Sequence, residues 1–268
     1  MADFQKLFAV RKPIIGMIHL PALPGTAAGR QARFRDLVEY ACSELDALQR
    51  GGVDGVIVEN FWDLPYFPAE TPAVTIASLA AVAGAVIQRA SIPVGVNILY
   101  NDFRGELAVA RAVGAAFIRS EVFVDPSISE TGLIPASAPY LVRERAALAA
   151  EEVAILSDVQ GKNTTPRWQR PIIESAVDAE KRGLADAVVV TGAGTGKSAS
   201  LEDLVQVKAA ISVPLIVGSG VTPAALADIL PVCDGAIVGS YFKQGGKIQA
   251  PTDVERVKEL MAAAKRAR

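Results

Sequence analysis

The sequence predicts an α/β fold, a single (β/α)8 (TIM) barrel that spans residues 1–268 as one domain. Eight short apolar runs are each followed by a helical pattern, with no linker between them. Gly or Asp precedes several of these runs, as in Gly-Gly-Val-Asp-Gly at residues 51–55, and such residues are typical of helix ends and turns. The run Ala187-Val-Val-Val190 lacks alternation, which indicates a strand buried on both faces of a parallel sheet.

The elements follow one another from the first residues to the last. Apolar runs predict strands at residues 14–19, 53–59, 93–98, 116–119, 153–158, 186–191, 214–218 and 235–239. Apolar residues at helical spacing predict helices at residues 31–50, 73–89, 103–113, 138–150, 171–182, 201–210, 223–230 and 253–268. Residues 121–135 fit neither pattern, so we expect a long loop there.

Composition and charge narrow the class of protein. A net charge of −2 without any basic run argues against a nucleic-acid partner. Cys42 and Cys233 lie far apart in the sequence, so we expect buried free thiols in a reducing compartment. The first residues lack a signal-peptide pattern. The most apolar segment, residues 72–87, is shorter than the ~20 residues that span a bilayer. We therefore expect a cytoplasmic protein without a transmembrane segment.

A glycine-rich loop follows the predicted strand at residues 186–191 and reads Thr191-Gly-Ala-Gly-Thr-Gly-Lys-Ser198. A nucleotide-binding P-loop needs glycine where Thr191 stands, and the third glycine comes one residue too early for the dinucleotide fingerprint. Glycines at 192, 194 and 196 leave backbone N–H groups uncovered, and a helical pattern begins at Leu201. This arrangement favours the binding of an anion over a plain flexible turn.

Polar residues stand at nearly every predicted strand end, where barrel enzymes have their active sites. In chain order they are His19, Glu59, Asn60, Asn97, Arg119, Glu121, Asp158, Lys162, Thr191, Lys197, Ser219 and Ser240. Burying such groups costs free energy unless they are paired, so a barrel built only for stability would not need them. We therefore expect a functional site at this end of the barrel.

Several of these residues allow more than one interpretation. His19 is a candidate general acid or base, or it orients the proline-rich loop that follows it. Glu59 is a candidate base, or it forms a salt bridge with Arg119. Lys162 near Asp158 could form a Schiff base, shuttle protons, face a phosphate, or be a solvated side chain.

A metal site is a further alternative at the same strand ends. Glu59, Glu121 and Asp158 could supply oxygen ligands to Mg²⁺. Zinc is not expected, because the chain has one histidine and two distant cysteines. We therefore assign no metal ligand and leave Mg²⁺ open as a cofactor.

The loops after the last two predicted strands carry the clearest binding signal. They read Gly218-Ser-Gly-Val-Thr-Pro223 and Gly239-Ser-Tyr-Phe-Lys243, and barrels often hold a phosphate between these two loops. Tight turns without a ligand are the alternative. The expected phosphate-binding residues are Gly192, Gly194, Gly196, Gly218, Ser219, Gly220, Gly239 and Ser240.

The loop Phe61-Trp-Asp-Leu-Pro-Tyr-Phe-Pro68 is unusually apolar for a solvent-facing segment. It either covers the mouth of the barrel or forms a subunit interface. The second reading would make the protein a homo-oligomer.

Several longer strings resemble the BtpA/SgcQ family over nearly the whole chain. They include residues 16–25 (GMIHLPALPG), 55–63 (GVIVENFWD), 94–99 (VGVNIL), 190–196 (VTGAGTG) and 217–222 (VGSGVT). The resemblance implies a barrel related to ribulose-phosphate-binding enzymes. One cyanobacterial member is linked to photosystem I accumulation, and other members look like proteins of sugar or nucleoside catabolism. The resemblance does not carry one settled reaction.

The chain departs from the family pattern after the fifth predicted strand. Members of the family commonly have His-x-Lys-His there, whereas this chain has Gln160-Gly-Lys162-Asn163. Gln160 and Asn163 do not titrate near neutral pH, so a mechanism that uses a histidine at these positions is not expected here.

Two hypotheses from different classes result. In the first, the protein is an enzyme for isomerisation, aldol-type cleavage or glycosidic cleavage of a small anionic, phosphorylated sugar- or nucleoside-like metabolite. Glu59 or Asp158 would be the base and His19 or Lys162 the acid, while Arg119 would position the substrate. Asn60, Asn97, Glu121 and Thr191 would contact it. In the second, the protein is a non-catalytic biogenesis or stability factor for a membrane complex such as photosystem I.

Overall fold

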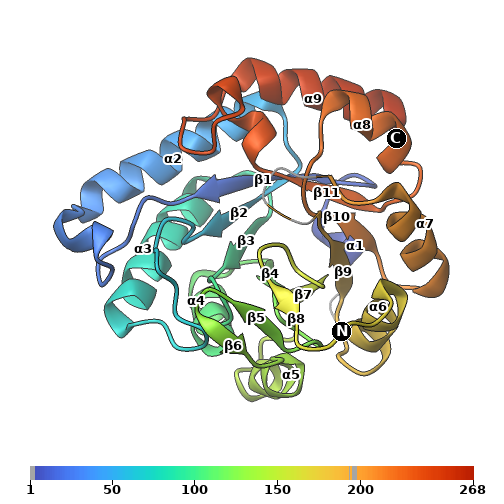
Figure 1. The fold of residues 1–268 in the computed structure, drawn as a ribbon. Helices are drawn as coiled ribbons and strands as arrows, with labels where there is room; N and C mark the ends of the chain where they lie inside the picture. The colour runs from blue at the N-terminus through green and yellow to red at the C-terminus, as the bar shows by residue number, and fades with distance from the viewer. Residues whose placement is uncertain (1–3, 193, 195–197) are drawn as a thin grey trace.

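In a computed structural model of the chain, which describes residues 4–192, 194 and 198–268, parallel strands close into a barrel (Figure 1). The barrel strands are β1 (Ile14–His19), β2 (Gly55–Glu59), β3 (Val94–Asn97), β4 (Phe117–Ser120), β7 (Ala154–Val159), β9 (Ala187–Val190), β10 (Leu215–Val217) and β11 (Gly235–Val238). Their order is β1-β11-β10-β9-β7-β4-β3-β2, and β11 pairs with β1 to close the sheet. The predicted (β/α)8 barrel is confirmed.

Helices form the outer ring around these strands in Figure 1. They are α2 (Phe34–Gly51), α3 (Ala73–Arg89), α4 (Phe103–Val113), α5 (Ala138–Ala147), α6 (Ile172–Lys181), α7 (Leu201–Ala210), α8 (Pro223–Ile229) and α9 (Val254–Ala267). Short 3₁₀ helices cover Ala28–Gln31 (η1), Ser240–Phe242 (η2) and Gln244–Gly246 (η3). The barrel strands are buried at every position, as expected when helices cover the outside and side chains fill the inside.

Aromatic rings close the end of the barrel where the strands begin. The Phe117 ring fills the interior beside β3, where a Cβ on Gly95 would approach it to 2.2 Å. The helix α1 (Phe4–Leu7) lies before β1, and Phe8 just after it packs on Phe117 at 5.9 Å between ring centroids. This apolar plug leaves the opposite end, where the strands finish, as the open end of the barrel.

The sequence-based bounds hold to the residue for β1, α3, α4 and α7 and differ elsewhere by a few residues. The helix predicted at residues 31–50 begins at Phe34, because Ala32 and Arg33 are extended after η1. The helix predicted at residues 138–150 ends at Ala147, and Ala149 has a left-handed φ of 47°.

The predicted loop at residues 121–135 is wrong in part. It contains β5 (Ser127–Ser129) and β6 (Gly132–Ile134), an antiparallel hairpin to which β8 (Thr165–Pro166) adds a third strand. Strands of two or three residues are too short to show an alternating pattern, so the sequence gives no signal for them.

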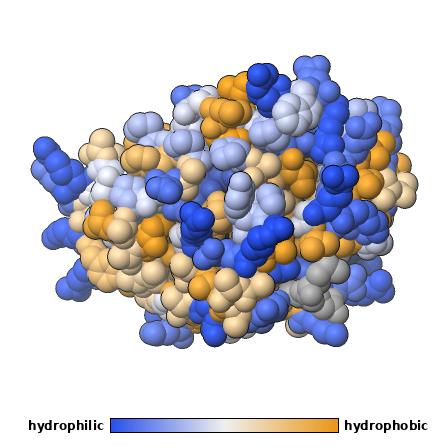
Figure 2. Space-filling view, turned by 90° about the horizontal axis from the view of Figure 1, so that it is seen from below, coloured by the Kyte–Doolittle hydropathy of each residue, from blue (hydrophilic) through white to orange (hydrophobic). Residues whose placement is uncertain are grey.

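Two further expectations concern membrane-spanning helices and the burial of the two cysteines. The side of the molecule seen in Figure 2 is a mosaic of hydrophilic and hydrophobic residues. Within the described ranges, no helix is long and apolar enough to cross a membrane. Both cysteines are free, but Cys42 is only half-buried, which corrects the expectation that both thiols are buried; Cys233 is buried.

Candidate active site

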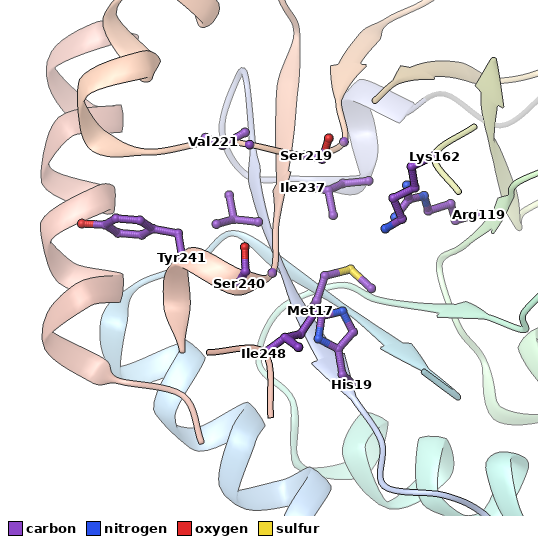
Figure 3. A pocket seen from close by; sticks show the side chains of 14 residues that line it. Met17, His19, Arg119, Lys162, Ser219, Val221, Ile237, Ser240, Tyr241 and Ile248 are labelled. Carbon is purple, nitrogen blue, oxygen red and sulfur yellow. The ribbon is translucent and has the colours of Figure 1, made fainter. Parts of the chain in front are cut away.

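Two adjoining cavities occupy the end of the barrel where the strands finish. We call the smaller one, about 30 Å³ in volume, the narrow chamber (Figure 3). Its lining is Met17, His19, Arg119, Lys162, residues 218–221, residues 237–241 and Ile248. We call the larger one, about 380 Å³, the wide chamber; its lining is Glu59, Phe61, Trp62, Leu64, Tyr66, Leu99, Tyr100, Glu121, Glu130, Lys162, Asn163 and Ile248. Lys162 and Ile248 line both chambers, which therefore adjoin at these two side chains.

Backbone from two neighbouring strand ends borders the narrow chamber. Gly218 follows β10, and a Cβ there would lie 2.7 Å from the Thr191 and Val189 side chains, so the close packing requires glycine. Gly220 has a left-handed φ of 69°, which glycine adopts at little cost. Gly239 follows β11, and a Cβ there would lie 3.0 Å from the His19 ring. These three glycines let the two loops approach the chamber with backbone instead of side chains.

The glycine-rich loop after β9 is connected to this chamber. The Gly192 N–H donates a hydrogen bond of 2.8 Å to the Ser219 hydroxyl. Gly194 is buried nearby in the chain. Gly196 and Lys197, both singled out in the sequence, lie outside the described residues.

Lys162 supplies positive charge where the two chambers meet. Its backbone N–H donates to the Thr191 hydroxyl at 3.1 Å, which fixes the start of this loop. Among the residues that the structure describes, none forms an ion pair or hydrogen bond with its ammonium group. Figure 3 shows the Lys162 side chain next to Arg119 and facing the chamber.

Arg119 and Asp158 neutralise each other beneath the site. Two hydrogen bonds of 2.9 Å join the guanidinium to the two carboxylate oxygens, and each side chain is 1% exposed. The salt bridge considered between Glu59 and Arg119 is therefore wrong; the partner is Asp158, whose strand β7 pairs with β4. A buried bidentate pair of this kind is rigid and well suited to holding one edge of the chamber in place.

Glu59, which with Asp158 was a candidate base, contacts Asn97 and His19. The Asn97 amide donates to Glu59 Oε2 at 2.7 Å, and His19 Nε2 lies 3.8 Å from Oε1. Burial, followed by the positive charges of Lys243, Lys162 and Arg119, lowers the pKa of His19 well below its usual 6.5. The imidazole is therefore neutral at physiological pH, and its ring packs on Phe61 at 4.4 Å.

Glu121, which lines the wide chamber, has a raised pKa. Burial raises the pKa of its carboxyl to about 7, reinforced by the negative charges of Asp158 and Glu59 and opposed by Arg119 and Lys162. Its Oε1 atom is buried and has no hydrogen-bond partner among the described residues. The same holds for Asn97 Oδ1 and His19 Nδ1. Unpaired buried polar atoms are costly, so those of His19, which lines the narrow chamber, and Glu121, which lines the wide one, indicate that a ligand completes the set.

Asn60 and Thr191, two of the predicted substrate contacts, line neither chamber and instead hold the scaffold. Asn60 accepts from the Leu99 N–H at 2.8 Å and donates to Asp63 at 3.1 Å, so its amide is used internally. Thr191 holds the Lys162 backbone as described above. Gln160, in the stretch that departs from the family pattern, donates to the Arg170 carbonyl at 2.9 Å and to Ser175 at 3.1 Å. Asn163 of the same stretch lines the wide chamber.

Lys243, which ends the loop after β11, is fully buried and paired with Glu44 and Thr252. The Mg²⁺ site considered from the sequence does not fit the structure, because both carboxylate oxygens of Asp158 accept hydrogen bonds from Arg119. Across the described ranges, no group of three or more histidine, cysteine or acidic side chains could hold a metal ion.

The apolar loop at residues 61–68 lies over the mouth of the barrel, as one of its two readings predicts. Phe61, Trp62, Leu64 and Tyr66 line the wide chamber, while Phe67 is 49% exposed.

Some lining residues were not predicted from the sequence: Met17, Tyr100, Glu130, Tyr241 and Ile248. Ile248 comes from an irregular segment after η3, so no periodic pattern could have identified it. Figure 3 shows the Tyr241 ring pointing away from the chamber, where it stacks with Arg256 at 4.3 Å.

Known proteins resemble this chain in sequence and in fold. The sequence model of the BtpA family matches residues 10–266. An uncharacterized protein of Pyrococcus furiosus is 38% identical, over 97% of this chain and 95% of its own. The photosystem I biogenesis protein BtpA of Synechocystis is 35% identical, over 97% and 91%.

Solved barrels also match, at sequence identities that show the fold alone. Thiamine phosphate pyrophosphorylase from Pyrococcus furiosus has a TM-score of 0.59 and 15% identity, with 96% of each chain covered. N-(5'-phosphoribosyl)anthranilate isomerase from the same organism has a TM-score of 0.57 and 16% identity, with 95% of this chain and 99% of the other covered.

Proposed function

The chain belongs to the BtpA family, and from the geometry of its site we propose that it is an enzyme for acid–base chemistry on a small phosphorylated metabolite. The substrate would be sugar- or nucleoside-like, and the reaction an isomerisation, a lyase reaction or a glycosidic cleavage. One observation carries the proposal: a lysine-bearing chamber bordered by glycine backbone adjoins a larger chamber lined by Glu121, whose buried Oε1 atom has no hydrogen-bond partner in the described part of the chain.

The narrow chamber is the proposed phosphate site. Its volume exceeds the ~10–15 Å³ that one water molecule needs. The ammonium of Lys162, which forms no ion pair with any residue that the structure describes, supplies a positive charge. Gly218, Ser219, Gly220, Gly239 and Ser240 border it, and barrels frequently bind phosphate between these two loops. The names of both solved barrels above contain a phosphorylated compound, which supports the same assignment for this chain.

The proposed proton chemistry uses Glu59 and Glu121. A carboxyl with a pKa of about 7 is protonated in part at neutral pH and can donate or accept a proton there. Glu121 therefore replaces His19 and Lys162 as the proposed acid, since the neutral His19 is suited to a hydrogen bond. Glu59 remains the proposed base. Asp158 is a positioning residue, because it pairs with Arg119 and holds this side chain in place. Arg119 in turn shapes the narrow chamber that would hold the substrate.

A thermal-shift screen tests the proposal without knowledge of the reaction. Phosphorylated sugars and nucleotides would be compared with their unphosphorylated counterparts, one pair at a time. A ligand at 100 times its Kd should add about 2.7 kcal/mol, which raises Tm by several degrees. We expect shifts only for phosphorylated members of the pairs. Equal shifts within every pair, or no shift for any, would contradict the phosphate site.

Ser240→Asp should weaken binding of the phosphorylated ligand at least tenfold, while Ser240→Asn should leave it nearly unchanged. The two side chains have almost the same size, but aspartate adds a negative charge beside the proposed phosphate. Like charges about 4 Å apart repel by roughly 4 kcal/mol at the effective dielectric constant near a protein surface. Isothermal titration of both variants measures the difference, and similar affinities would place the phosphate elsewhere.

A second candidate is a non-catalytic biogenesis or stability factor for a membrane complex. The name of the Synechocystis relative favours it. In that case, changes at Glu121 and Ser240 would leave complex accumulation intact, whereas changes at exposed residues such as Phe67 would not. Self-association, a cytoplasmic location and the single-domain assignment stay predictions.

A further inference from the structure

The wide chamber is larger than a phosphate needs, and its lining is aromatic and acidic. We propose that it binds a flat heterocycle that donates hydrogen bonds, so that the ligand is a nucleoside 5′-monophosphate with its phosphate in the narrow chamber and its base in the wide one. This inference rests on the proposed phosphate site and extends it to the other end of the ligand.

The adjoining cavities suit one extended ligand. Lys162 and Ile248 line both of them, so a group that leaves the narrow chamber between these side chains enters the wide chamber directly. The wide chamber, at about 380 Å³, falls in the range of 300–1,000 Å³ that is usual for small-molecule sites. A sugar phosphate alone would leave most of it unfilled.

Aromatic side chains dominate its walls. Phe61 and Trp62 form an edge-to-face pair with centroids 5.0 Å apart, and Tyr66 and Tyr100 form another at 4.9 Å. All four line the wide chamber. Such rings offer π-faces on which a nucleobase stacks, an interaction that is largely independent of the base's identity.

The wide chamber is rich in carboxyl groups, whose oxygens can accept hydrogen bonds. Those of Glu59, Glu121 and Glu130 line it, and among the described residues Lys162 is the single cation that lines it with them. Glu121 Oε1 is buried and unpartnered within the described ranges. A second phosphate or a carboxylate would meet repulsion there, whereas ring N–H and amino groups would pair with the acceptors. The charges therefore favour a base over a second anionic group.

Trp62 itself provides the most direct test. The chain has two tryptophans, and Trp168 is 56% exposed and lines neither chamber. In the Trp168→Phe variant, all tryptophan fluorescence comes from Trp62. This variant would be titrated with inorganic phosphate, ribose 5-phosphate and each of the four common nucleoside 5′-monophosphates, followed by fluorescence and calorimetry.

We expect at least one nucleoside monophosphate to quench Trp62 and to bind at least tenfold more tightly than ribose 5-phosphate. Adding Trp62→Ala should reduce this advantage to less than threefold and leave the ribose 5-phosphate affinity unchanged; Trp62→Phe, the conservative control, should retain most of it. Equal affinities for ribose 5-phosphate and all four nucleotides would overturn the inference but leave the phosphate site intact. Failure of every phosphorylated ligand would overturn the phosphate site itself.

Discussion

Glu121→Gln should remove one part of the pH-dependent loss of stability that the wild-type protein shows between about pH 5 and pH 8, while the buried Glu106, whose pKa is also raised, keeps its own part. Burial raises the pKa of this carboxyl to about 7 in the folded protein, whereas an unfolded glutamate titrates near its ordinary value. The stability that the neutral carboxyl contributes is therefore complete below the unfolded pKa and is lost as pH rises through about 7. The charged or acidic groups acting on it are Arg119, Lys162, Asp158, Glu59 and Glu106.

The size of the effect follows from the shift. Each pKa unit corresponds to about 1.36 kcal/mol, so ionising Glu121 in the folded protein should cost on the order of 3 kcal/mol at pH 8. Glutamine is neutral at both pH values and nearly the same size. Urea unfolding of both proteins at pH 5 and pH 8 should show that the free energy of unfolding of the variant rises relative to that of the wild type at the higher pH. A constant difference between them would show that Glu121 is ionised normally.

The same substitution has a catalytic consequence under the proposed function. A positioned general acid or base contributes about 10²–10⁴-fold to the rate, so kcat should fall by that factor while ligand affinity changes little. The limb of the wild-type pH–rate profile near pH 7 should disappear in any residual activity. A variant with full turnover and an unchanged profile would remove Glu121 from the mechanism.

Asp158→Asn should be the most destabilising conservative change in the barrel interior. It leaves the Arg119 guanidinium buried without its bidentate partner, and breaking such a pair typically costs about 3–5 kcal/mol. For a domain of this size the loss corresponds to a Tm decrease of roughly 6–20 °C. Glu59 and Glu121, which also interact electrostatically with Arg119, should hold the effect toward the lower end.

A matched control is Asp36→Asn, which breaks the Arg33–Asp36 pair on the surface, where the two side chains are 80% and 51% exposed. Exposed pairs contribute about 0–1 kcal/mol, so its Tm should stay close to that of the wild type. If Asp158→Asn behaved like this control, the buried pair would not be what fixes the edge of the narrow chamber.

The strand ends were predictable because the barrel has a strong repeating pattern. Once the strands are placed, parallel pairing brings His19, Glu59 and Lys162 to one end of the barrel without further information. Their partners were not predictable, since Arg119 could reach acids on either side and only side-chain packing selects Asp158 over Glu59.

The pKa of Glu121 was likewise beyond the sequence, because it depends on burial more than on sequence neighbours. Lys243 follows a glycine-containing loop that resembles an anion site, but its side chain turns toward α2 and pairs with Glu44. The wide chamber draws Tyr100 and Ile248 from irregular segments, which carry no periodic signal. Chain position thus predicts which strand ends meet, while side-chain direction requires the packed structure.

A crystal structure of the protein with a phosphorylated ligand chosen by the thermal-shift screen would show directly where the phosphate binds. We expect the phosphate between residues 218–221 and residues 239–241, in contact with the Lys162 ammonium. A ligand that binds in solution and yet places its phosphate outside the narrow chamber would contradict the central assignment.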